Sequence, residues 1–384
     1  MNAPATVSMN QRVLQKIAQG ERVFNLTAGD PLVPAHPAII TAVQHGLSTH
    51  TLFPYPPISG LPHLRKLAAE WMNECSHARY TEEDVLVTPG GKYAIFSILS
   101  SLVKPGTEVL IPAPYWPSYP DLVTMVGSTP ILMATRAEDG WKITPQHIRQ
   151  HASARSAMLI FNSGCNPTGV VYTQEEVCAL LEEAKRHNLT VLSDEVYSGL
   201  VYDEMSFSSC GSFPEHEDHV IVVQSCSKHF GMTGWRVGFV FARAPVIRSL
   251  AAFQGRTTTG VAYTSQWAAI GALEHANEVN DYVKAIMRKR REVAVQTCNE
   301  LFHLSIDAPP SSLYLFVPLT SFDPESIESS VEFCERLLNE GNIGLVPGAA
   351  FGVEGYVRIA FTLDEPLLKE ALQMLHRAAS SGGR

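Results

Sequence analysis

Residues 219–236 read His219-Val-Ile-Val-Val-Gln-Ser-Cys-Ser-Lys-His-Phe-Gly-Met-Thr-Gly-Trp-Arg236, an apolar run that ends in polar and charged residues. The run at 219–223 has the Val and Ile content of a buried strand. Two hydroxyls, an amine and a guanidinium come after it, from Ser225, Ser227, Lys228 and Arg236. The end of this strand therefore carries groups suited to binding an anion and to nucleophilic chemistry.

Other short runs rich in Val, Ile and Leu have the same character, and they lie at residues 84–88, 107–111, 130–133, 157–161, 190–193 and 237–241. Their continuous apolar character predicts strands covered on both faces. Helix-like stretches separate most of them, such as Gln174–His187, which Thr173 would cap. The alternation predicts an α/β fold with a mainly parallel seven-stranded sheet between helices.

The pattern changes near residue 277, where a long charged helix begins. A strand near 313–317, a helix, and a last strand and helix around 356–361 then predict a smaller α+β domain. The first 45 residues hold one helix-like stretch and the loop 26–31, too little for a core, so we expect them to pack on the C-terminal part. The predicted division is a large domain of residues 46–276 and a small domain of residues 1–45 and 277–384.

The composition excludes several classes of protein. Of the 384 residues 45% are hydrophobic and 17% charged, and the net charge is -9, so neither a disordered chain nor a nucleic-acid-binding protein is expected. The longest basic cluster, Arg288–Arg291, is predicted to be a solvated helix face, with an anion-binding patch as the alternative. Seven scattered cysteines without a C-x-x-C pair predict reduced thiols and no metal site. No signal-like or membrane-spanning run occurs, so we expect a cytoplasmic protein without a membrane partner.

Lys228 has two interpretations, a cation for a nucleotide phosphate or an amine that forms a Schiff base. The nucleotide motif Gly-x-x-x-x-Gly-Lys-Ser/Thr is found neither here nor around Gly90-Gly91-Lys92-Tyr93, so the amine is favoured. The strand 190–193 runs directly into Asp194, and a carboxylate in so apolar a neighbourhood needs a positive partner. A pyridinium nitrogen would serve, and capping of the next helix is the alternative.

Three motifs follow one another in the chain: Asn-Pro-Thr-Gly at 166–169, Asp-x-x-Tyr at 194–197, and Ser-x-Ser-Lys at 225–228 with Arg236 beyond it. In this order they resemble the class I and II aminotransferases of the fold-type-I pyridoxal-phosphate enzymes, particularly the bacterial aspartate aminotransferases. The resemblance extends from Thr6 to the final helix. It implies pyridoxal 5'-phosphate as a cofactor bound by the large domain.

The resemblance also implies roles for individual residues. Lys228 would form the Schiff base and move the substrate proton, while Asp194 would keep the ring nitrogen protonated. Tyr197 and Asn166 would bind the phenolic oxygen, and Trp116 would stack on the ring. The residues at or near the phosphate would be Gly91, Lys92, Ser225, Ser227 and Arg236.

The resemblance further implies which residues bind the substrate and which residue reaches a second subunit. Arg358 lies among Val, Ile and Ala, where an unpaired charge is costly, and would bind the substrate carboxylate with Gly29, Trp116 and Asn166 nearby. Tyr55 would reach the phosphate of a neighbouring subunit, which implies a homodimer with shared active sites.

The reaction implied is transfer of an amino group from an amino acid to a 2-oxo acid by a ping-pong mechanism. Lys92 favours aspartate or glutamate as the donor, whereas departures such as Tyr93 and Gly260 leave aromatic or neutral amino acids open. The same lysine chemistry would also allow β-elimination, cyclisation or oxidation. A cofactor-binding regulator without turnover is the third hypothesis.

Overall fold

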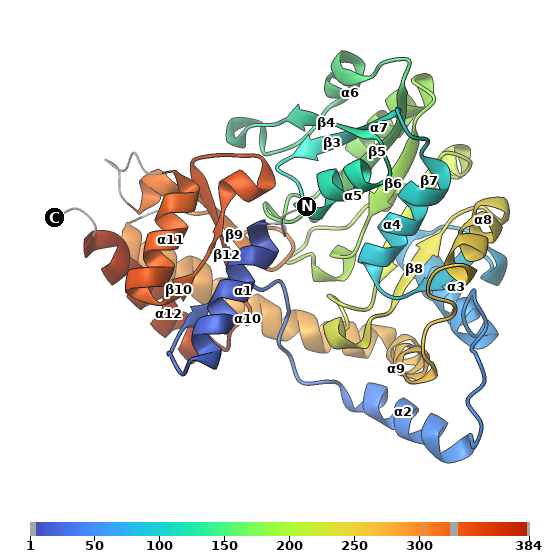
Figure 1. The fold of residues 1–384 in the computed structure, drawn as a ribbon, viewed down its shortest axis with the longest axis horizontal. Helices are drawn as coiled ribbons and strands as arrows, with labels where there is room; N and C mark the ends of the chain where they lie inside the picture. Colours follow the sequence, from blue (N-terminus) through green and yellow to red (C-terminus); the bar gives the residue numbers. More distant parts are fainter. Residues whose placement is uncertain (1–4, 304, 323–328, 382–384) are drawn as a thin grey trace.

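The computed structural model describes residues 5–303, 305–322 and 329–381, and a seven-stranded sheet forms its larger part (Figure 1). The ends of the predicted small domain, residues 1–4 and 382–384, lie outside the described residues. The strand order is β2-β8-β7-β6-β5-β3-β4. The strands are β2 (Val85–Thr88), β3 (Glu108–Ala113), β4 (Thr129–Ala134), β5 (Ser156–Asn162), β6 (Thr190–Asp194), β7 (Val220–Ser225) and β8 (Gly238–Phe241).

The mainly parallel sheet is confirmed, with each expected strand within two residues of its observed bounds. Only β8 runs antiparallel, to both β2 and β7, while β7, β6, β5, β3 and β4 are parallel neighbours. The reason is the connection between β7 and β8, which contains the 3-10 turn η6 (Thr233–Trp235) and no crossover helix.

Alternate side chains of the sheet pack under different helices. Ile160 and Val240 belong to a core with α4 (Gly91–Leu102), α5 (Ser118–Met125) and α8 (Ala244–Gly255). Leu159 and Phe239 belong to the core on the other face, whose helices are α3 (Pro62–Ser76), α6 (Pro145–His151), α7 (Gln174–Arg186) and α9 (Tyr263–Glu274). The expected double coverage is wrong for β4, where most side chains are not buried and Leu132 is 43% exposed.

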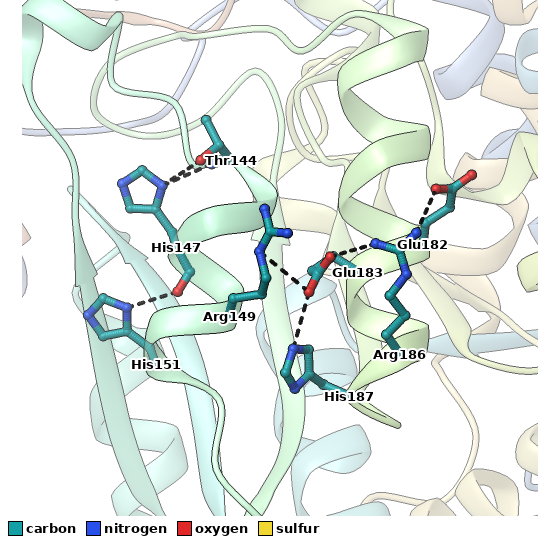
Figure 2. Close-up of polar contacts among 8 residues, drawn as sticks. All are labelled: Thr144, His147, Arg149, His151, Glu182, Glu183, Arg186 and His187. Carbon is teal, nitrogen blue, oxygen red and sulfur yellow. Dashed lines mark hydrogen bonds and ion pairs between the residues drawn. The ribbon is translucent and has the colours of Figure 1, made fainter.

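The predicted cap of α7 is confirmed, since the Thr173 hydroxyl accepts the Glu176 N–H at 3.3 Å. Farther along α7, Glu183 joins it to α6 through Arg149, and it also binds Arg186 and His187 at the end of α7 itself (Figure 2). Burial raises the pKa of Glu183, but the charges of Arg149 and Arg186 and the hydrogen bonds from Arg186 and His187 outweigh it, and the net pKa is lowered. This polar cluster lies outside the cavity described below and serves helix packing.

The C-terminal part has the predicted α+β character. An antiparallel sheet is formed by β11 (Val346–Pro347), β12 (Tyr356–Ala360) and β9 (Tyr314–Pro318). Beside it, β1 (Phe24–Asn25) pairs in parallel with β10 (Ile343–Gly344). The helices of this part are α1 (Ala5–Ala18), α10 (Ala276–Phe302), α11 (Ser330–Gly341) and α12 (Glu365–Ser381). The long helix α10 runs from α9 toward α12 (Figure 1).

The single helix expected in the first 45 residues is a wrong prediction, because α1 and α2 (Pro37–Thr49) both form there. α1, β1 and the loop that follows β1 pack on the C-terminal part, whereas α2 packs on α9. The two helices are in close contact, since a Cβ added to Gly271 of α9 would lie 2.6 Å from the carbonyl oxygen of Ala38 in α2. The domain division stays a prediction, and the packing of α2 favours a first boundary before Pro37.

The prediction that the basic cluster of α10 is a solvated face is only half right. Arg288 and Lys289 are exposed as expected, but Arg290 and Arg291 are only 6% and 4% exposed. They fall on the side of α10 that buries Met287 and Ala294, so the solvated face is confined to half of the cluster. None of the helices described is long and apolar enough to cross a membrane.

Candidate active site

A cavity of about 620 Å³ lies at the carboxyl ends of the parallel strands. Asn162, Asp194 and Ser225 end β5, β6 and β7 and line it side by side, because neighbouring parallel strands deliver their last residues to one edge. The opposite wall comes from the C-terminal part, with Tyr314 of β9 and Arg358 of β12. The cavity therefore lies between the two parts of the chain.

The structure brings the predicted site residues together, with one exception. Tyr55 does not line the cavity and is 89% exposed, so its predicted role toward a neighbouring subunit stays a prediction. The predicted residues that line the cavity are Gly29, Gly91, Lys92, Trp116, Asn166, Asp194, Tyr197, Ser225, Ser227, Lys228, Arg236 and Arg358.

Asp194 is a buried acid on the floor of the cavity. Burial raises its pKa to about 6, although the hydrogen bond from the Tyr119 hydroxyl (2.6 Å to Oδ2) and the charge of Lys228 lower it. Within the described part of the chain, Oδ1 accepts only a long 3.4 Å bond from the Val196 N–H, and the turn that follows is the short η3 (Ser198–Leu200). The alternative role as a cap for a following α-helix thus finds little support.

Lys228 lies just beyond β7, and its Nζ donates to the Gly29 carbonyl oxygen. The amine is 5.9 Å from the centre of the Tyr197 ring. Lys228 therefore joins the large sheet to the loop of residues 26–31, which belongs to the first part of the chain. A neutral form of this amine would be a nucleophile and a base within the cavity.

Arg358 is 3% exposed and makes contacts with neutral groups. Nη1 donates to the Asn166 Oδ1 at 2.9 Å and Nη2 to the Thr27 carbonyl oxygen, while the guanidinium lies 4.2 Å from the Tyr314 ring centre. The Tyr314 hydroxyl is in turn 3.0 Å from that of Tyr197. These partners carry no negative charge. Burial of the Arg358 guanidinium would therefore cost less free energy if an anion in the cavity were bound to it.

A second surface with the groups to bind an anion lies at the N-terminus of α4. Gly90 has a φ of +87°, and a Cβ there would lie 2.5 Å from Nη2 of Arg236. The Ser225 and Ser227 hydroxyls are 2.8 Å apart at the same end of the cavity. Lys92, in the first turn of α4, has its pKa lowered by burial and by the charge of Arg236. Backbone N–H groups, two hydroxyls and two cations together suit a phosphate.

Trp116 forms part of the cavity wall, with the Lys92 ammonium 4.9 Å from its ring centre and Tyr119 packed edge-on at 5.3 Å. Sequence reasoning missed Tyr119, although its spacing of three residues from Trp116 in an aromatic stretch could have drawn attention to it. It also missed Tyr314 and Asn10. Asn10 reaches the cavity from α1, where its Oδ1 accepts the Thr27 hydroxyl at 3.0 Å, and no sequence signal marks it.

Tyr119→Phe is expected to raise the pKa of Asp194 above its value of about 6, because a hydrogen bond that favours the ionised carboxylate is removed. A larger share of Asp194 would then be protonated at neutral pH. Carbon-13 NMR titration of aspartate carboxyls in the cofactor-free protein measures this, with Tyr115→Phe as a control in the same segment. An unchanged Asp194 titration would contradict the assigned hydrogen bond.

The fold agrees with comparisons to known proteins. A family model described as "Aminotransferase class I and II" matches residues 21–375. The chain belongs to this family. As an aminotransferase it is an enzyme that transfers amino groups, and the predicted fold and family are confirmed.

Relatives resemble this aminotransferase over nearly the whole chain. A "Probable aspartate/prephenate aminotransferase" of Thermus aquaticus is 33% identical, covering 98% of this chain and 97% of the relative. An "Aspartate aminotransferase" of Streptomyces avermitilis is 30% identical, covering 98% and 94%. Among solved structures, the aspartate aminotransferase from Thermus thermophilus with maleate has a TM-score of 0.92 at 31% identity and covers 98% of this chain and 97% of its own.

Proposed function

We propose that the cavity binds pyridoxal 5'-phosphate and that the enzyme moves an amino group from aspartate or glutamate to a 2-oxo acid. The observation that carries this proposal is the meeting of an amine, a buried acid and a buried guanidinium on one cavity, from Lys228, Asp194 and Arg358. Each comes from a different element, so their convergence is a property of the fold. The same cavity serves the amino acid and then the oxo acid, which predicts ping-pong kinetics.

The residues present fit the cofactor. The N-terminus of α4 with Ser225, Ser227 and Arg236 would hold the phosphate, and a Cβ on Gly90 would intrude there, 2.5 Å from Arg236. Oδ1 of Asp194 has only one long hydrogen bond and would pair with the ring nitrogen. Tyr197 and Asn166 would donate to the phenolic oxygen, with Trp116 beside the ring.

When bound, pyridoxal phosphate supplies an aldehyde that exchanges amines and a ring that accepts electrons from the substrate carbon. Lys228 would take the α-proton of the substrate and return a proton. Asp194, ionised above its pKa of about 6, would keep the ring nitrogen protonated at neutral pH. Arg358 would hold the α-carboxylate, which fixes the α-carbon near the lysine.

The preference for an acidic substrate rests on Lys92. Its ammonium group lies over Trp116, on the cavity wall, where it can meet a second carboxylate. The aspartate aminotransferase from Thermus thermophilus was solved with maleate, a dicarboxylate. Several relatives are named aspartate/prephenate aminotransferases, and prephenate is a dicarboxylic oxo acid that the same lysine would suit as an acceptor.

The experiment that tests the reaction is a half-reaction screen. The purified holoenzyme is mixed with each common amino acid without any oxo acid, and the absorbance of the cofactor is followed. We expect a stoichiometric change with aspartate or glutamate. Release of pyruvate and ammonia instead would favour β-elimination, and no change with any amino acid would contradict transamination.

Lys92→Gln is expected to lower kcat/KM for aspartate by about tenfold, the loss of roughly one hydrogen bond between charged groups, and to leave alanine little changed. Parallel kinetics with the two donors measure this ratio. Lys92→Arg keeps the charge and serves as the control. Equal losses for both donors would assign Lys92 to the phosphate rather than to the substrate side chain.

We also propose a homodimer whose sites are completed by Tyr55 of each partner. Tyr55 lies in a loop with other exposed apolar side chains, Leu52 (80%) and Phe53 (53%), as an interface would require. Sedimentation is expected to show a dimer, and Tyr55→Ala to lower cofactor affinity. A cytoplasmic location, without nucleic-acid or membrane partners, remains our expectation.

A further inference from the structure

Two consecutive arginines of α10, Arg290 and Arg291, are buried next to the exposed Arg288 and Lys289. Burial of a guanidinium is costly unless its N–H groups find partners. Consecutive residues of an α-helix point about 100° apart, so the two side chains reach different segments of the chain. Each segment leads to the cavity.

Arg290 binds the segment that carries Gly29. Its Nη1 donates to the Pro31 carbonyl oxygen at 2.5 Å and to that of Thr362 at 2.7 Å, and Nη2 donates to the Leu32 carbonyl oxygen at 3.3 Å. All three partners are neutral backbone groups. Thr362 follows β12, so Arg290 ties the loop of residues 27–32 to the strand that carries Arg358.

Arg291 binds the segment that leads to Tyr314. Its Nε donates to the Pro309 carbonyl oxygen at 2.8 Å, and its two Nη atoms reach the Asp203 carboxylate at 2.7 and 3.3 Å. The guanidinium also lies 4.9 Å from the Tyr202 ring centre, and the Tyr202 hydroxyl donates to the Ser312 carbonyl oxygen. Residues 309–312 are thus held directly and through Tyr202.

The two segments meet at the cavity. A Cβ added to Gly29 would lie only 2.0 Å from the Tyr314 hydroxyl oxygen, so the loop and the tyrosine are in contact. Gly29 accepts a hydrogen bond from Lys228, and Tyr314 lies against Arg358. The distance between the two segments therefore affects the positions of Lys228 and Arg358 in the cavity.

We propose that Arg290 and Arg291 are positioning residues for substrate binding. By holding residues 27–32 and 309–314 at a set distance, they orient Gly29 and Tyr314 against Lys228 and Arg358. This inference rests on the proposed function, because it requires that a carboxylate substrate binds at Arg358. Neither arginine lines the cavity, so neither contacts the substrate.

The test compares Arg290→Gln and Arg291→Gln with Arg288→Gln, an exposed arginine of the same helix. Hydrogen exchange of the holoenzyme without substrate is measured in residues 26–32 and 309–314, and calorimetry gives its affinity for maleate. We expect Arg290→Gln to speed exchange selectively in 26–32, and Arg291→Gln in 309–314. Each should weaken maleate binding and raise KM by about tenfold, as one charge-assisted contact would, with kcat changed less.

Arg290→Lys keeps the charge without the planar fork, and it is expected to recover part of the maleate affinity. This variant also carries the test if Arg290→Gln does not fold. Faster exchange throughout the protein with unchanged maleate affinity would overturn the positioning role and leave two purely structural arginines. Failure of the wild-type holoenzyme to bind maleate or any amino acid would overturn the proposed function itself. Loss of binding in the variants alone would leave the proposed function intact.

Discussion

Lys228→Ala is expected to lower kcat/KM by at least about 10⁴-fold, because general acid–base catalysis alone contributes up to about that factor and the nucleophilic amine is lost as well. The near-ultraviolet or visible absorbance of the lysine-bound cofactor should disappear with it. The variant should still fold, since the side chain contacts the Gly29 carbonyl and lies outside the hydrophobic core. Absorbance spectra and steady-state kinetics measure both effects.

Lys228→Arg separates charge from nucleophilicity. An arginine can still donate to the Gly29 carbonyl but does not lose its proton near neutral pH, so this variant is expected to be as inactive as the alanine variant. Lys66→Ala, at a lysine that is 64% exposed on α3, provides the matched control with unchanged kinetics. Substantial turnover by either Lys228 variant would remove this residue from the mechanism.

Arg358→Ala is expected to raise KM for the amino acid and the oxo acid alike, on the order of 100-fold, because two charge-assisted hydrogen bonds to one carboxylate are lost. The cofactor should remain bound, since the proposed phosphate site lies around Arg236 at the N-terminus of α4. Kinetics with both substrates and the cofactor content of the purified variant measure this separation.

Arg358→Lys tests whether the planar fork matters in addition to the charge, and an intermediate KM is expected. Arg243→Ala, at an arginine on the surface, is the control for loss of a guanidinium alone. A change in KM for only one of the two substrates would contradict binding of the α-carboxylate, which both substrates share. Loss of the cofactor would place Arg358 in the cofactor site instead.

Local patterns were sufficient for the sheet, whereas most of the predicted residues that line the cavity came from the resemblance to a known family. Strands such as β5 and β7 were predictable because an apolar run of about five residues between turn signals has few alternatives in a globular fold, and β6 ends at the Asp194 that the pattern marked. Polar groups at the ends of parallel strands meet at one edge, so Asn166, Asp194 and Lys228 could be assigned to one site from their places after the apolar runs.

The failures have a common physical cause, which is packing between segments far apart in the chain. The cluster at 288–291 has the charge pattern of a solvated face, yet α10 is covered by other segments and two of its arginines are buried. Likewise α2 packs on α9, a helix far away in the chain, and no local pattern in Pro37–Thr49 indicates that partner. A pattern of polar and apolar residues shows that a helix face will be covered, but not which segment covers it.

By itself the sequence determined the α/β class, the family, and the residue types that meet at the strand ends, because these depend on short-range periodicity and on motifs within a few residues. Only the tertiary structure decided that Tyr119 binds Asp194, that Tyr314 meets Gly29, and that Arg290 and Arg291 are buried. Such contacts join segments that are distant in the chain, and their formation depends on how whole helices and sheets pack, which no local pattern encodes.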